Sequence, residues 1–198
     1  MHFLSKSKIM SGLQCPRRLW LEVKRPDWMH FSDRAKQSFA AGHEVGAVAQ
    51  QLHPEGVLIG FEGELSSALA ETGHMVERPG DITLFEATFQ HGRGLVRADV
   101  LSRREKGWHM VEVKGATSLK SHYLNDVAIQ AWVIQGAGLP LKTIQLWHVD
   151  NSFVYRGDED YRGLFAREDV TETVTELMQQ VPEWAARCQK ALSSEEPQ

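Results

Sequence analysis

Three runs of strand-forming residues, joined by short polar turns, constrain the fold of this 198-residue chain most strongly. The runs cover residues 82–90, 94–102 and 108–114, and each is rich in valine, leucine, phenylalanine or other apolar residues. Glycine-containing turns of this length typically join neighbouring strands into antiparallel hairpins. The sequence therefore predicts a three-stranded antiparallel meander in the middle of the chain.

The patterns on either side of the meander predict helices and further strands. Helices are expected at 5–24, 32–53, 63–77, 121–137 and 169–192, and strands at 56–60 and 143–149, with 152–155 as a candidate extension. The first helix is expected in two pieces that break near Gly12, with Pro16 in the first turn of the second piece. Ser32 is a candidate N-cap for the second helix.

This order gives an α/β fold with an αβββαβ core, in which helices flank a mixed central sheet. We expect a single domain over residues 1–198. Its parts are a basic N-terminal helical segment (1–31), the core (32–155) and a C-terminal helical appendage (156–198).

Charged residues stand out on two of the predicted central strands. Asp99 lies on the second strand of the meander, and Glu112 and Lys114 share one face of the third. If these strands pair, the two carboxylates converge and need a cation between them, or one must take up a proton. Two carboxylates with waters and a phosphate suit Mg²⁺, and a neighbouring lysine can stabilise developing charge. The alternative is a cross-strand ion pair of Glu112 with Lys114 or Arg97 on an exposed face.

Composition and charge narrow the class of protein. No apolar run is long enough to span a membrane, and the first ten residues lack the pattern of a signal peptide. The net charge is −4, but residues 1–36 hold eight Lys or Arg against three acids, which leaves room for a positive groove. The two cysteines, Cys15 and Cys188, form no metal-binding pair, and we expect both to be reduced in a cytoplasmic protein.

Several segments together resemble a known family. The pair "ADV…VEVKG" is similar to the paired motifs of the PD-(D/E)XK nuclease superfamily, whose core is αβββαβ and restriction-endonuclease-like. The opening "LSKSKIMSGLQCPRRLWLE" resembles the start of many RecB-like nucleases, including those of CRISPR adaptation. "GHEVGAVAQQLHPEGVLI" and "EVKGATSLKSHYLNDVAIQAWVIQGAG" extend the resemblance to a bacterial RecB-like family over nearly the whole chain.

The resemblance implies a role for each matching residue. Asp99 and Glu112 would be metal-binding carboxylates, with the Val113 carbonyl as a further ligand and Lys114 as the catalytic lysine. Glu44 matches the acidic residue of the first core helix. Many relatives carry a histidine there, so the neighbouring His43 is the alternative; adjacent helix positions point about 100° apart, which makes one ligand at a time the expectation.

Other implied roles concern DNA and cofactors. Gln130 matches the glutamine of the RecB-like signature, although Ile134 stands where that signature has a tyrosine. The residues expected to contact DNA are Arg17, Arg18, Arg97, Lys120 and Tyr123. Some relatives hold an iron–sulfur cluster, but this chain has too few cysteines for one, and Cys15 is expected to be a buried thiol.

The resemblance therefore implies a Mg²⁺- or Mn²⁺-dependent nuclease that cleaves DNA, an exonuclease acting in DNA repair or in defence against phages and plasmids. The alternative is a module of the same fold that binds nucleic acid, or joins a larger protein complex, without cleaving.

Overall fold

A computed structural model describes residues 3–60, 64–105, 107–193 and 195–197. The helices are α1 (Lys6–Gln14), α2 (Pro16–Lys24), α3 (Asp33–Gln51), α4 (Leu65–Glu77), α5 (Ser121–Gly136), α6 (Thr171–Met178) and α7 (Val181–Ser193), with a 3₁₀ turn, η1, at Pro26–Trp28. The strands are β1 (Leu4–Ser5), β2 (Val57–Leu58), β3 (Ile82–His91), β4 (Gly94–Arg104), β5 (Gly107–Lys114), β6 (Leu141–Val149) and β7 (Phe165–Asp169).

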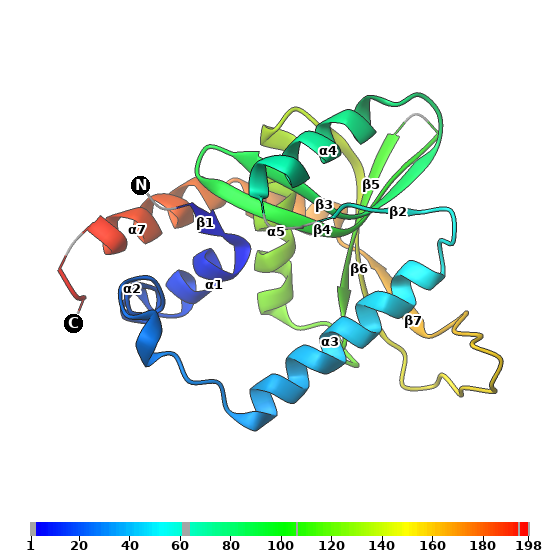
Figure 1. Ribbon diagram of the computed structural model, residues 1–198, viewed down its shortest axis with the longest axis horizontal. Coiled ribbons are helices and arrows are strands. Elements are labelled where there is room, and N and C mark those ends of the chain that lie inside the picture. The colour runs from blue at the N-terminus through cyan, green and yellow to red at the C-terminus, as the bar shows by residue number, and fades with distance from the viewer. Residues whose placement is uncertain (1–2, 61–63, 106, 194, 198) are drawn as a thin grey trace.

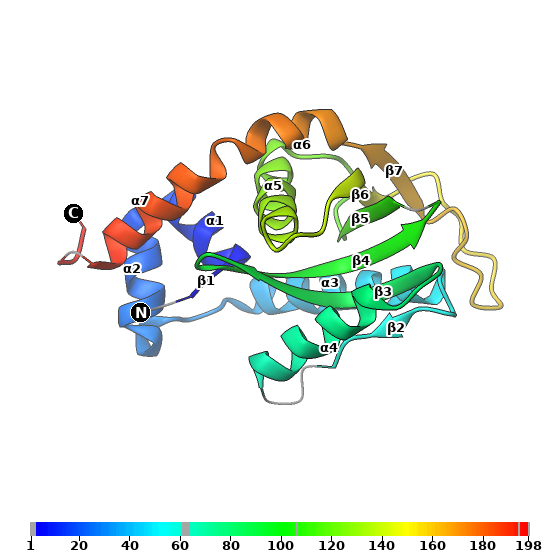
Figure 2. The same cartoon turned by 90° about the horizontal axis from the view of Figure 1, so that it is seen from above.

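The sheet is mixed and runs in the order β2-β3-β4-β5-β6-β7, with β1 added beside β4. The β3–β4 and β4–β5 pairs are antiparallel, as the predicted meander requires, whereas β5 and β6 are parallel. Helix α3 covers one face of the sheet, α5 and α6 cover the other, and α4 packs on β3 in the same hydrophobic cluster as α5 (Figure 2). The expected αβββαβ order and the mixed sheet flanked by helices are thus confirmed.

Two hydrophobic clusters hold these layers together. The larger one joins α5 to the sheet and to α1, α4, α6 and α7, through side chains such as Ile129, Ile134 and Leu146. The smaller one lies under α3 and includes Ala49, Val111 and Trp147. Among the described residues, no helix is both long enough and apolar enough to cross a bilayer.

The two-piece helix expected at 5–24 is confirmed, with Pro16 in the first turn of the second piece; the break lies at Cys15, three residues after Gly12, where the backbone is extended. Three other local predictions were wrong. Residues 152–155 do not extend β6, because the Asp150 side chain accepts hydrogen bonds from the backbone and hydroxyl of Ser152 and turns the chain.

The other two concern the C-terminal part and a cysteine. The helix expected at 169–192 is interrupted: β7 ends at Asp169, and α6 and α7 are separate helices. Pro182 lies in the first turn of α7, a place that proline tolerates, whereas it would break a continuous helix. Cys15 is exposed; the buried thiol is Cys188, whose Sγ lies where a side chain at Gly12 would go.

Candidate active site

The site begins where β4 and β5 separate. Their ladder ends at the Val100–Val111 pair, so Asp99 and Glu112 are the first residues beyond it. Strand β5 continues beside β6 as far as the Lys114–His148 pair, while β4 stays with β3. At this point Asp99 Oδ2 accepts a hydrogen bond from the Val113 backbone N–H at 2.8 Å. The Asp99 carboxylate therefore takes the place of the backbone carbonyl that would accept from this N–H if the ladder continued. The point where β4 and β5 separate, called the fork below, brings Asp99 and Glu112 together.

The neighbouring strand is distorted at the same level. Glu86 of β3 has a φ of +55°, and the β3–β4 ladder passes from Phe85–Val100 to Ala87–Ala98 without a Glu86–Asp99 pair. A left-handed backbone costs a non-glycine residue roughly 1–2 kcal/mol. Such strain concentrates at functional sites, where surrounding structure holds it in place. The Glu86 carboxylate meets Arg97 at 3.2 Å instead of entering the fork.

Strand β1 pairs with the first residues of β4, on the part of β4 that is not paired with β5. Leu4 and Ser5 pair in parallel with Gly94 and Leu95, and Leu4 is fully buried. The next residue, Lys6, starts α1, which packs beside α5 (Figure 1). The Lys6 ammonium therefore reaches the fork and lies 2.8 Å from Glu112 Oε1.

Two lysines and two carboxylates form a closed ring in the fork. Lys114 Nζ lies 2.5 Å from the same Glu112 Oε1, and it also bonds Asp126 Oδ2. Lys6 Nζ is 3.3 Å from Asp126 Oδ1. On the other side of Glu112, Gln130 Nε2 donates to Oε2 at 2.5 Å. Every oxygen of Glu112, which is 2% exposed, thus has a partner.

Helix α5 supplies two of these groups because of its periodicity. Its central residues are almost all apolar and buried, because the helix packs against the sheet and also against α1 and α6. Asp126 and Gln130 are four residues apart and share a face. Both are buried, and their polar ends meet the ring.

Burial and proximity shift the ionisation of all these groups. Burial raises the pKa of Asp99 to about 8; Glu112 adds to the shift, and Lys6, the Val113 N–H and Lys114 oppose it. Burial alone would raise the pKa of Glu112 too, but Lys6 and Lys114 hold it well below its usual range. Burial also raises the pKa of Asp126.

For the two lysines, burial and the neighbouring charges shift the pKa in opposite directions. Burial works to lower their pKa values, but the carboxylates outweigh it. The pKa of Lys6 is raised by Glu112, Asp126 and Asp99, and that of Lys114 by Glu112 and Asp126. At neutral pH both ammonium groups and Glu112 are therefore charged, and the raised pKa of Asp99 favours its protonated form.

The structure brings together four of the predicted site residues: Asp99, Glu112, Val113 and Lys114, with Gln130 as a fifth in direct contact. Glu44 and His43 lie on α3, and the backbone of this part of α3 approaches Gly115, just after β5. Both side chains are exposed, and neither makes a hydrogen bond or ion pair with the described part of the chain.

The predicted DNA contacts divide into two groups. Tyr123 lies at the fork, with Lys114 Nζ at 5.4 Å and Lys120 Nζ at 5.9 Å from its ring centroid. Arg97 precedes Asp99 by two residues on β4 and pairs with Glu86. Arg17 and Arg18 lie on the exposed side of α2 and pair with Glu196 and Glu22.

Two residues of the ring were not among the predicted site residues. Lys6 gave no local signal beyond the basic character of its segment, since its position depends on a pairing with β4 about 90 residues away in sequence. Asp126 did give one: an acid one turn from Gln130, on the apolar face of a helix, is expected to have a buried partner.

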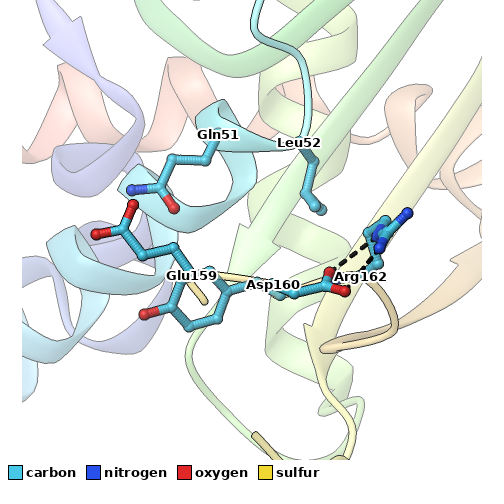
Figure 3. A pocket seen from close by; sticks show the side chains of 6 residues that line it. Gln51, Leu52, Glu159, Asp160 and Arg162 are labelled. Atoms are coloured by element: carbon cyan, nitrogen blue, oxygen red, sulfur yellow. Dashed lines mark hydrogen bonds and ion pairs between the residues drawn. The ribbon is translucent and has the colours of Figure 1, made fainter. Parts of the chain in front are cut away.

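One pocket in the surface lies away from the fork. A pocket of about 250 Å³ lies between the end of α3 and the loop after β6, and contains none of the fork residues. Figure 3 shows its lining, in which Arg162 is paired with Asp160. The candidate active site is thus defined by its buried charges.

Comparison with known proteins supports the fold. A solved alkaline exonuclease, LHK-Exo from Laribacter hongkongensis, is similar with a TM-score of 0.52 and 12% sequence identity, over 96% of this chain and 89% of that chain. SSO0001 is also similar, with a TM-score of 0.43 and 12% identity, over 92% of this chain and 76% of that chain. No protein-family model and no curated protein matches the sequence. The similarity to the exonuclease shows a shared, restriction-endonuclease-like fold.

Proposed function

We propose that this chain is a divalent-metal-dependent nuclease of the RecB-like branch of the PD-(D/E)XK superfamily, and that it hydrolyses DNA phosphodiester bonds. One observation carries the proposal: the β4–β5 fork holds Asp99, Glu112 and Lys114 together in a fold shared with an exonuclease. By analogy with that neighbour we further propose exonuclease action, in DNA repair or in defence against foreign DNA.

The donor set fits Mg²⁺ or Mn²⁺. The described residues contain no group of three or more His, Cys, Asp or Glu side chains arranged to hold a metal. Mg²⁺, however, commonly binds through one or two carboxylates, with waters and substrate phosphate completing its shell. Asp99 and Glu112 supply those carboxylates, and Glu112 already pairs with a positive charge, the Lys6 ammonium. Asp99, Glu112 and the Val113 carbonyl would hold the ion.

Each protein group has a task in such a reaction. A bound divalent ion supplies Lewis-acid stabilisation of charge on the scissile phosphate and lowers the pKa of a water molecule. Lys114 would orient the attacking water and stabilise charge in the transition state. Gln130 holds Glu112 in place, and Asp126 holds Lys114. Tyr123 and Lys120 would contact the DNA beside the cleaved bond.

The test is cleavage of end-labelled single- and double-stranded DNA with Mg²⁺, Mn²⁺ or EDTA, beside an Asp99→Asn variant. Metal-dependent degradation that disappears in the variant is the expected result, and the product ladder then shows whether cleavage starts at an end. DNA binding without cleavage under any of these conditions would contradict the proposal and favour the alternative, a non-cleaving module of the same fold.

A further inference from the structure

The single negative charge of Glu112 is paired with two positively charged lysines. Two ammonium groups, from Lys6 and Lys114, contact the same oxygen, Oε1, at 2.8 and 2.5 Å. Gln130 occupies Oε2. A divalent ion that binds Glu112 through Oε1 must therefore displace one of the two ammonium groups, and the displaced group needs another acceptor.

Lys6 is the partner that is easiest to displace. Its contact with Glu112 is the longer of the two ammonium contacts, and its side chain is more exposed than that of Lys114, at 25% against 19%. Lys6 is also the only one of the two for which the proposed chemistry has no task. Its flexible four-carbon stem allows the ammonium to move without moving β1 or α1.

Asp126 offers the new acceptor. Its Oδ2 bonds Lys114, whereas its Oδ1 is buried and makes no hydrogen bond. That oxygen lies 3.3 Å from Lys6 Nζ, close enough for an ion pair but without hydrogen-bond geometry. A buried carboxylate oxygen without a hydrogen bond is unfavourable, so a small shift of Lys6 toward Asp126 would satisfy it.

We propose that Lys6 is an internal counter-ion of the active site: it neutralises Glu112 in the metal-free protein and transfers to Asp126 when a divalent ion engages Glu112. Lys6 and Asp126 are then positioning residues. Lys6 sets how strongly metal must compete for the site, and Asp126 receives the displaced ammonium while it keeps Lys114 in place. This proposal rests on the proposed function, because it requires the metal site at Asp99 and Glu112.

The two residues should affect metal binding in opposite directions. Lys6→Met removes the competing charge, so Mn²⁺ should bind about tenfold more tightly than to the parent, a typical size for coupled sites. Asp126→Asn removes the acceptor, so Lys6 stays on Glu112 and Mn²⁺ should bind about tenfold more weakly. Titration calorimetry with Mn²⁺ alone, without DNA, measures both effects.

Three further variants complete the design. Lys8→Met makes the same charge change two residues away, on a side chain outside the ring, and should leave the Mn²⁺ affinity within about twofold of the parent value. Lys6→Arg keeps the charge and should bind Mn²⁺ no more tightly than the parent. The double variant Lys6→Met/Asp126→Asn should behave like Lys6→Met, because no displaced ammonium is left to receive.

Each outcome decides between the ideas. Unchanged Mn²⁺ affinity in folded Lys6→Met, or effects of the two variants that simply add in the double variant, would overturn the counter-ion exchange. If Lys6→Met does not fold, Asp126→Asn decides alone: weaker binding supports the exchange and unchanged binding overturns it. Mn²⁺ binding that is absent in the parent, or unaffected by Asp99→Asn, would instead overturn the proposed function.

Discussion

The two ends of the β4–β5 ladder use basic side chains in different ways. At the hairpin end, Arg103 donates to three backbone carbonyls at and just after the end of α4: Gly80 at 2.7 Å, Val76 at 3.1 Å, and Arg78. These carbonyls are left unsatisfied where the helix ends, so Arg103 acts as a C-terminal cap from another strand. At the fork end, by contrast, Lys6 and Lys114 face carboxylates.

The difference indicates different roles for the two ends. A cation on neutral carbonyls ties segments together and has nothing to exchange when a ligand arrives. Lysines that pair with buried carboxylates are different, because a metal ion that binds the same carboxylates competes with the lysines for them. Breaking a buried ion pair typically costs more than removing one ordinary hydrogen bond, so the fork end is also the more sensitive to single substitutions.

Substitution of Lys114 should have the largest effect on activity. Lys114→Met is expected to lower DNA cleavage by at least about a thousandfold, since the lysine is assigned both water orientation and charge stabilisation. DNA binding, measured by fluorescence anisotropy, should change little. Lys142→Met is the matched control, because Lys142 is also a strand lysine with a carboxylate partner, Glu105, but lies far from the fork on the exposed side of β6.

Equal cleavage by folded Lys114→Met and the parent would show that the fork does not carry the chemistry. Circular dichroism at the assay temperature establishes that each variant is folded.

Substitutions at the two ends should also differ in their effect on stability. Glu112→Gln leaves two buried ammonium groups with Asp126 as their remaining carboxylate partner, and the free energy of unfolding should fall by about 3 kcal/mol or more. Arg103→Met removes hydrogen bonds to partly exposed carbonyls and should cost about 1 kcal/mol. Urea unfolding followed by circular dichroism measures both. A larger loss in Arg103→Met would mean that the ring contributes little to the fold.

The central sheet and its two acids could be predicted because they are local patterns. Alternation fixes the faces of β4 and β5, and the short turns fix their pairing, so Asp99 and Glu112 had to meet if the hairpin formed. The interruption of the C-terminal helix could also have been predicted from local sequence, because Pro182 indicates that a new helix begins there. Helix periodicity also placed Asp126 beside Gln130.

Lys6 could not be predicted in this way. Its place depends on a two-residue strand pairing with residues 94 and 95, and such a short segment carries no periodicity. The strain at Glu86 is similarly invisible, because nothing in "LFEATF" demands a left-handed residue. Both features depend on how β4 is shared among three other strands, which is a property of the assembled sheet.

The smallest expected effect is the pH dependence of metal binding. The pKa of Asp99 is raised to about 8 in the metal-free fold, from about 4 in the unfolded chain. Between these values the native state binds more protons than the unfolded state, so this group's contribution to stability decreases as pH rises. A metal ion must displace the proton, and its apparent affinity should rise by up to about tenfold per pH unit until pH 8.

Thermal unfolding at a fixed Mg²⁺ concentration tests this at pH 6, 7 and 8. The rise in Tm caused by Mg²⁺ should grow with pH, because stabilisation by a ligand follows its apparent affinity. In Asp99→Asn both the rise and its pH dependence should be lost. Arg103→Met should be less stable than the parent at every pH but keep the same Mg²⁺-induced rise, since the partners of Arg103 are backbone carbonyls outside the fork. A Mg²⁺ response that is flat from pH 6 to 8 would mean that Asp99 is ionised before the metal arrives. The fork would then already be set for metal binding at neutral pH, and it would differ from the hairpin end only in where its charges lie.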